Sequence, residues 1–142
     1  MVIAGIDFGD ARTGIAVCDK YEMMASEAGC VRADSYKKML AAVAEKIREL
    51  NPERIVLGNP KNMNGTEGPR SEKCKAFAAA LQEETGIEVG LVDERLTTVR
   101  AHKILSERGK KRKDTVDALS ARLILEDYLT MRKREKTASQ DT

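Results

Sequence analysis

Two periods of apolar residues alternate along this chain. Residues 2–17 hold two apolar runs separated by a turn with Gly9 and Asp10, which predicts a β-hairpin with Asp7 near the end of its first strand. We expect a third strand over residues 22–31, so that three antiparallel strands come first. A charge at the end of a buried strand costs free energy unless a cation or hydrogen-bond donors compensate it, so Asp7 is a candidate for chemistry.

Helical and strand patterns alternate in the rest of the chain. Ser35 precedes a helical pattern that ends before Asn51-Pro52 at about residue 50, and short apolar runs at 54–58 and 88–92 predict buried parallel strands. We expect further helices over 71–85, from 97 or 98 to about 108, and from 114 or 115 to about 134. This order predicts an α/β fold, a mixed sheet with helices on both faces, in a single domain over residues 1–134 before a polar, disordered tail at 135–142.

Composition narrows the class of protein. Hydrophobic residues make up 42% of the 142 positions and charged residues 34%, which is typical of a soluble folded domain. Aromatic residues are only 4%, so stacking of bases on aromatic side chains is not expected to be the main binding mode. The three cysteines lack CxxC spacing, which favours reduced thiols in a cytoplasmic protein over a structural zinc site. We expect no signal peptide and no membrane span.

Basic residues are clustered although the net charge is only +2. Residues 108–113 contain five basic side chains in six, and residues 132–134 form a second run. Such clusters can contact phosphates, but a solvated loop and a solubilising tail explain them equally well.

Carboxylates follow the ends of the predicted strands. Asp7 ends the first strand, Asp93 and Glu94 follow the last one, and Asp117 lies in the first turn of the last helix. If these acids converge they require cations, and oxygen ligands suit Mg²⁺ or Mn²⁺. Simpler roles stay open for each residue: a polar turn, an ion pair with Arg95, or compensation of the helix dipole.

Four blocks of the sequence together resemble the YqgF/RuvX family of Holliday junction resolvases. The resemblance covers residues 2–129 and departs from the family mainly at Asn59, where the family often has an apolar residue, and at Ser120-Ala121. The blocks are residues 5–9 with Arg12 and 14–17, Gly58 and Pro60 with 62–68, residues 92–98 with Ala101, and residues 117–121 with Ile124 and Leu125.

The resemblance implies an RNase H-like fold with five strands and a metal-dependent endonuclease. Its implied catalytic and metal-binding residues are Asp7, Glu94 and Asp117, with Mg²⁺ or Mn²⁺ as cofactor. Its implied substrates are the 5′ end of precursor 16S ribosomal RNA, Holliday junctions, or both. We expect a cytoplasmic monomer or homodimer whose substrate-binding residues are Arg12, Lys61, Asn62, Asn64, Arg95, Lys110, Lys111, Arg112 and Lys113.

Two other functions remain open from the sequence. One is a nucleic-acid binding module with the same fold but no catalysis, although all three implied acids are present. The other is an actin-like domain that grips nucleotide phosphates with a similar hairpin. Such proteins need two domains with a second phosphate loop, and this chain contains only one such hairpin.

Overall fold

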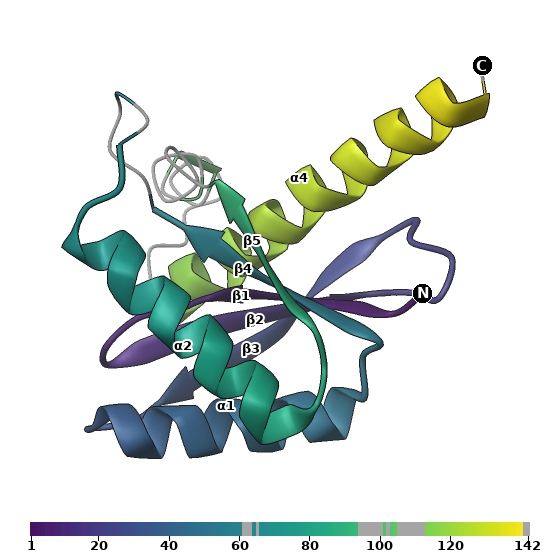
Figure 1. Ribbon diagram of the computed structural model, residues 1–142. Helices are drawn as coiled ribbons and strands as arrows, with labels where there is room; N and C mark the ends of the chain where they lie inside the picture. The colour runs from purple at the N-terminus through teal and green to yellow at the C-terminus, as the bar shows by residue number, and fades with distance from the viewer. Residues whose placement is uncertain (61–63, 65, 94–100, 102, 105–112, 141–142) are drawn as a thin grey trace.

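A mixed β-sheet lies at the centre of the computed structural model (Figure 1), which describes residues 1–60, 64, 66–93, 101, 103, 104 and 113–140. Its strand order is β3-β2-β1-β4-β5, with antiparallel pairing among the first three strands of the chain and parallel pairing of β1 with β4 and of β4 with β5. The predicted five-stranded mixed sheet is therefore confirmed. The strands are β1 (Ile3–Asp7), β2 (Arg12–Cys18), β3 (Ala25–Arg32), β4 (Arg54–Asn59) and β5 (Val89–Asp93).

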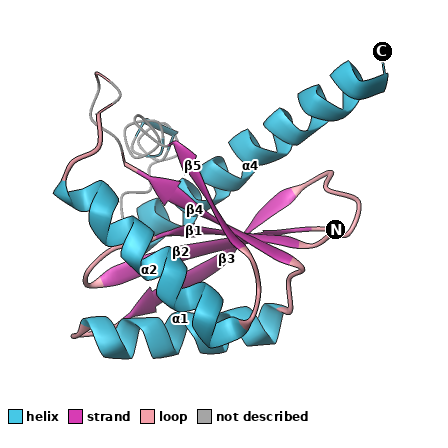
Figure 2. Cartoon of the chain, in the orientation of Figure 1, coloured by secondary structure: helices cyan, strands magenta, loops and turns pink. Residues whose placement is uncertain are grey.

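Helices cover both faces of the sheet, as predicted. Figures 1 and 2 show α1 (Tyr36–Leu50) and α2 (Pro69–Thr85) on one face and α4 (Lys113–Gln140) crossing the other, with the C-terminal half of α4 extending past the sheet. The helix predicted from 97 or 98 to 108 lies mostly outside the described residues. Within it, Ala101, Lys103 and Ile104 are helical, and Ala101 packs against Leu119 of α4.

Alternation along β1 divides the core into two layers. Ala4, Ile6 and Phe8 belong to the cluster that α1 and α2 cover, whereas Ile3 packs with residues of α4. Successive side chains of a strand point to opposite faces, so Asp7 shares the α4 face with Ile3 and Gly5. The alternation of apolar side chains along β1 thus places Asp7 on the face that α4 covers.

Local sequence signals explain the limits of α1. The Ser35 side chain accepts a hydrogen bond from the Lys38 N–H at 3.2 Å, which caps the first turn. Asn51 ends the helix in the left-handed conformation with φ 49°, and its N–H donates to the Ile47 carbonyl at 2.8 Å. The predicted helix is confirmed at both ends.

Several predicted boundaries differ from the structure, and three of them have a local explanation. The third strand begins at Ala25 rather than residue 22, because Glu22 has φ 58° and the Asp19 carboxylate accepts from the Met23 N–H in a turn. Helix α2 begins at Pro69 rather than residue 71, since proline suits the first helical position. Helix α4 continues from the expected end at 134 to Gln140, through residues with no glycine or proline. The division into a domain over 1–134 and a tail over 135–142 stays a prediction.

None of the cysteines, Cys18, Cys30 and Cys74, forms a disulfide bond, in agreement with the sequence. In the described part of the chain, no helix has the length and apolar character needed to cross a membrane.

Candidate active site

Asp7 lies at the carboxyl end of the central strand, where the ends of the parallel strands β1 and β4 meet. Ligands of open α/β sheets bind beyond this edge. The Asp7 carboxylate faces the start of α4, and burial raises its pKa to about 7, with a further increase from the negative charge of Asp117 and a smaller opposing effect from Arg70. The raised pKa of Asp7 therefore means that nearby positive charge does not fully compensate the negative charge of this buried carboxylate.

Gly14 brings Asp117 to Asp7. Gly14 is the direct partner of Asp7 across the β1–β2 pair. A side chain at this position would overlap the backbone of α4 at Asp117 and Ala118, so only glycine lets the helix rest on the strand here. Asp7 and Asp117 therefore come together because Gly14 places no side chain between β2 and α4.

Arg12 contacts the second acid of this pair. Its Nε donates to Asp117 Oδ2 at 2.9 Å, and both side chains are partly exposed. The sequence predicts Arg12 as a residue that holds substrate, and the structure places it at the site but in an ion pair with Asp117. Cys30, opposite Gly14 on β3, also lies here, with Sγ 4.0 Å from Asp117 Oδ2.

Arg70 is a site residue that the sequence did not reveal. It lies in the first turn of α2, donates through Nη2 to the Phe8 carbonyl and places Nη1 3.3 Å from Asp10 Oδ1. Its guanidinium also lies 5.0 Å from the centre of the Phe8 ring, close enough for a cation–π contact. No sequence signal marks this role, because it depends on the start of α2 lying beside the turn after β1.

The end of β4 and the loop after it carry two further polar residues, Asn59 and Asn64, of which Asn64 belongs to the predicted substrate-binding set. Asn64 Oδ1 accepts from the Thr66 N–H at 3.1 Å and from Thr66 Oγ1 at 2.6 Å, so this side chain closes a local turn. Asn59 is buried and accepts from Ser71 Oγ at 2.5 Å, which joins the end of β4 to the start of α2. Asn59 is therefore a structural residue on the face opposite Asp7, and a role of Asn64 in substrate binding stays a prediction.

The remaining predicted site residues have no described side chain. Residues outside the described part of the chain are Lys61, Asn62, Glu94, Arg95, Lys110, Lys111 and Arg112; for Lys113, only its backbone at the start of α4 is described.

The chemistry of the two described acids suits a hard divalent cation. Asp7 and Asp117 both offer carboxylate oxygens, and the raised pKa of Asp7 indicates that a cation would relieve an existing electrostatic cost. Among the described residues, no three His, Cys, Asp or Glu side chains are grouped so that they could hold a metal ion. A complete metal site would need a further ligand, and Glu94 is the predicted one.

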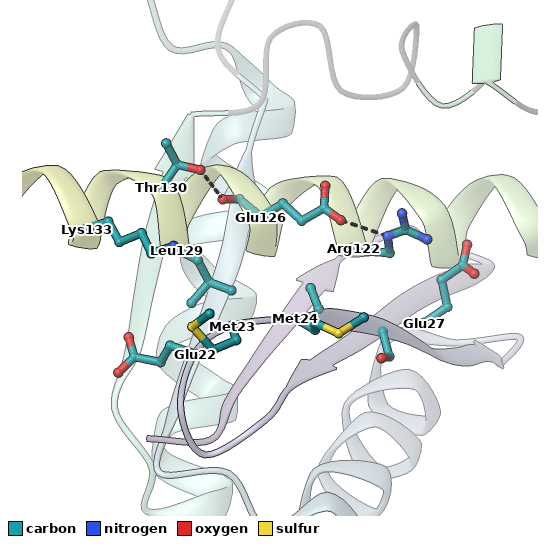
Figure 3. Close-up of a pocket in the computed structure, with 11 residues that line it drawn as sticks. Glu22, Met23, Met24, Glu27, Arg122, Glu126, Leu129, Thr130 and Lys133 are labelled. Carbon is teal, nitrogen blue, oxygen red and sulfur yellow. Dashed lines mark hydrogen bonds and ion pairs between the residues drawn. The ribbon is translucent and has the colours of Figure 1, made fainter.

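A separate groove of about 740 Å³ lies between α4 and residues 22–27 (Figure 3). Its lining includes Met23, Met24 and Leu129 together with Glu126 and Arg122, whose Nε donates to Glu126 Oε1 at 2.9 Å. None of the described site residues lines this groove.

A family model described as RuvX, Holliday junction resolvase, matches residues 1–131. The chain belongs to the RuvX family. A protein of Agathobacter rectalis named "Putative pre-16S rRNA nuclease" is 46% identical over 135 residues, covering 91% of this chain and 94% of that protein. A protein of Syntrophus aciditrophicus with the same name is 39% identical over 142 residues, covering 98% of this chain and 95% of that protein.

Solved structures share the fold of this RuvX family member at low sequence identity. Thermus thermophilus RuvC in complex with a Holliday junction substrate has a TM-score of 0.59 and 18% identity, with coverage of 94% of this chain and 96% of that one. The fowlpox virus Holliday junction resolvase has a TM-score of 0.61 and 14% identity, with coverage of 92% and 99%. These similarities confirm the predicted RNase H-like fold. Family membership confirms the expected class of activity, a nuclease that acts on nucleic acid.

Proposed function

We propose that this protein is a metal-dependent endonuclease whose catalytic acids are Asp7, Asp117 and Glu94. The observation that carries the proposal is the convergence of Asp7 and Asp117 at the carboxyl end of the central strand, where burial and mutual repulsion raise the pKa of Asp7 to about 7. Two acids held together at this energetic cost are typical of a site that binds a cation.

Glu94 is proposed as the third ligand on the grounds of its sequence position. It follows Val92 by two residues, and Val92 packs in the cluster on the α4 face, which Asp7 shares. β5 is separated from β1 only by β4, a backbone distance of about 10 Å that an Asp and a longer Glu side chain can bridge from either side. When bound, Mg²⁺ or Mn²⁺ would activate water and stabilise charge on a phosphodiester.

The described side chains would orient this acid set. Arg12 holds Asp117 Oδ2 through Nε and so restrains the orientation of this carboxylate. Arg70 holds the Phe8 carbonyl and so restrains the backbone that follows Asp7. Each acid of the described pair is thus restrained by an arginine from another element, which limits the number of positions the carboxylates can adopt before substrate arrives.

The names of the relatives and of the family model supply the substrate classes. We propose that the substrate is precursor 16S ribosomal RNA, a four-way DNA junction, or both, and that the protein acts in the cytoplasm as a monomer or homodimer. Arg12 and the predicted loop residues are proposed to contact the phosphate backbone. They are Lys61, Asn62, Asn64, Arg95, Lys110, Lys111, Arg112 and Lys113.

A cleavage assay with Mg²⁺ tests the proposal. We expect the wild-type protein to cut a precursor 16S ribosomal RNA fragment or a four-way DNA junction, and we expect Asp7→Asn and Asp117→Asn to abolish this activity. Asp127→Asn is the matched control, because Asp127 lies on α4 ten residues beyond Asp117. Undiminished cleavage by Asp7→Asn would overturn the site assignment, and binding without cleavage by the wild type would identify a non-catalytic binding module.

A further inference from the structure

A groove of about 610 Å³ opens beside the acid pair at the ends of β2 and β3. Its lining includes three basic side chains, Arg12, Arg32 and Lys38, and one acid, Asp34. The Ala33 N–H donates to the Ala11 carbonyl at 3.2 Å and so ties together the two segments that carry the arginines. The two arginine-bearing segments are therefore fixed to each other, and three of the four charged side chains that line the groove are basic.

Arg12 and Arg32 are direct partners across the antiparallel β2–β3 pair. Residues directly opposite each other point to the same face, and like charges in such a pair are unfavourable by about 0.2–1 kcal/mol. Asp117 pairs with Arg12 at 2.9 Å, and Arg32 has an interaction of its own. A phosphate between the two guanidinium groups would accept hydrogen bonds from both, because they lie on one face and each presents a planar set of donors that suits phosphate oxygens.

The first turn of α1 adds to the positive potential on the other wall. Lys38 lies there with Nζ 3.0 Å from Asp34 Oδ1, in a pair that is largely exposed on both sides. No acidic residue lies in the first turn of this 15-residue helix, so the positive end of its dipole is not compensated within the turn. Asp34, the one acidic group in the lining, is thus opposed by Lys38 and by the end of the helix.

We propose that this groove binds a phosphodiester of the substrate strand next to the one that is cut, with Arg32 and Lys38 as binding residues in addition to Arg12. This inference rests on the proposed function, because the groove begins at Arg12, which contacts the catalytic acid Asp117. A nucleic-acid backbone that passes the acid pair would continue over Arg32 towards Lys38. The chemistry recognised is the phosphate group, which RNA and DNA share.

Binding to two labelled probes tests the groove, in an Asp7→Asn background that binds without cutting. The probes are a four-way DNA junction and a precursor 16S ribosomal RNA fragment, each titrated between about 50 and about 200 mM salt. We expect Arg32→Gln and Lys38→Gln each to weaken binding by roughly eightfold at about 0.1 M salt and to reduce the slope of log K against log[salt] by about 1. Arg32→Lys should restore the slope, because it keeps the charge, with only part of the affinity.

Matched controls on α1 separate the groove from a general effect of charge. Lys46→Gln removes a lysine that is paired with Glu49 at 3.6 Å, as Lys38 is paired with Asp34, and Arg48→Gln removes an exposed arginine near the end of the same helix. We expect both controls to bind like the parent. If the Asp7→Asn protein binds neither probe, the proposed function fails and the groove inference with it. If it binds both and the groove variants match the controls, the groove inference alone is overturned.

Discussion

Gly14 is the position where one added methyl group tests the candidate active site most directly. It lies opposite Asp7 on β2, and the backbone of α4 rests on it. A Cβ at Gly14 would lie 2.9 Å from the Ala118 nitrogen and closer still to the Asp117 carbonyl oxygen, whereas ordinary contacts begin at 3.4 Å. Because these atoms belong to a helix backbone and the Asp117 carbonyl oxygen is the closest of them, Gly14→Ala must move α4 away from the sheet by at least about 1 Å.

Two effects of Gly14→Ala should follow from this displacement. Overpacking of this kind costs about 1–3 kcal/mol of stability, which corresponds to a decrease in Tm of about 3–10 °C for a domain of this size. Moving Asp117 relative to Asp7 should also lower kcat, by about 10- to 100-fold, since a misplacement near 1 Å can cost about 100-fold. Gly90→Ala on β5 is the matched control, because a Cβ there meets no atom of the described residues within 4 Å.

The assay measures Tm by thermal denaturation and kcat on whichever probe the wild type cuts with Mg²⁺. If Gly14→Ala matches Gly90→Ala in both quantities, α4 does not rest on β2 and the two aspartates are not brought together in this way. If Gly14→Ala lowers Tm but leaves kcat unchanged, the packing is confirmed and the catalytic role of Asp117 is refuted.

Three further predictions concern charge and buried polar groups. The folded-state pKa of Asp7 is raised from 3.8 to about 7, so in the absence of metal the free energy of unfolding should decrease progressively from about pH 4 to about pH 7. Asp7→Asn should remove this decrease. Mg²⁺ should raise the Tm of the wild type but not that of Asp7→Asn. Hydrogen bonding to Arg132 lowers the pKa of Glu22 to about 2, so Glu22→Gln should lower the free energy of unfolding by about 1 kcal/mol at pH 7. In thermal melts this difference should shrink as the pH falls from about 4.5 towards 2, and cleavage should be unaffected. Asn59→Leu should lower the free energy of unfolding, measured with denaturant, by about 1–3 kcal/mol, because it leaves the Ser71 hydroxyl without its partner. Adding Ser71→Ala should recover part of this loss. If the losses of the two single variants simply add in the double variant, the pairing is contradicted.

The layout of the fold could be predicted because local signals and apolar runs agree. Ser35 and Asn51 mark the ends of α1 with side-chain and backbone caps, and the runs at residues 54–58 and 88–92 are too uniformly apolar for strands that face water. The turn around Glu22 could not be predicted, because its conformation depends on hydrogen bonds to Asp19 and on distant partners. Glu22 pairs with Arg132, 110 residues away, and with the N-terminal amine.

Two residues of the predicted acid set, Asp7 and Asp117, come together in the structure, whereas Glu94 lies outside the described residues and stays a prediction. A charge at the end of an apolar strand makes Asp7 a candidate from the sequence, because burying such a charge costs free energy unless it is compensated. Arg70 and Asn59 gave no such signal, since the same residues on an exposed helix turn or strand end would have no special role. Their functions arise only when α2 lies against the ends of β1 and β4.

The balance of charge at the site links metal binding to nucleic-acid binding. Among the described residues, the negative charges of Asp7 and Asp117 are offset by Arg12, which pairs with Asp117, and by Arg70, which lowers the pKa of Asp7. A site close to neutrality has little attraction for a phosphodiester. A site that has bound a divalent cation carries an excess of positive charge beside the groove that Arg12 and Arg32 line. Each ligand should therefore tighten the binding of the other by the same factor. For this reason the affinity of the wild-type protein for its substrate should depend on metal, and that of Asp7→Asn should not.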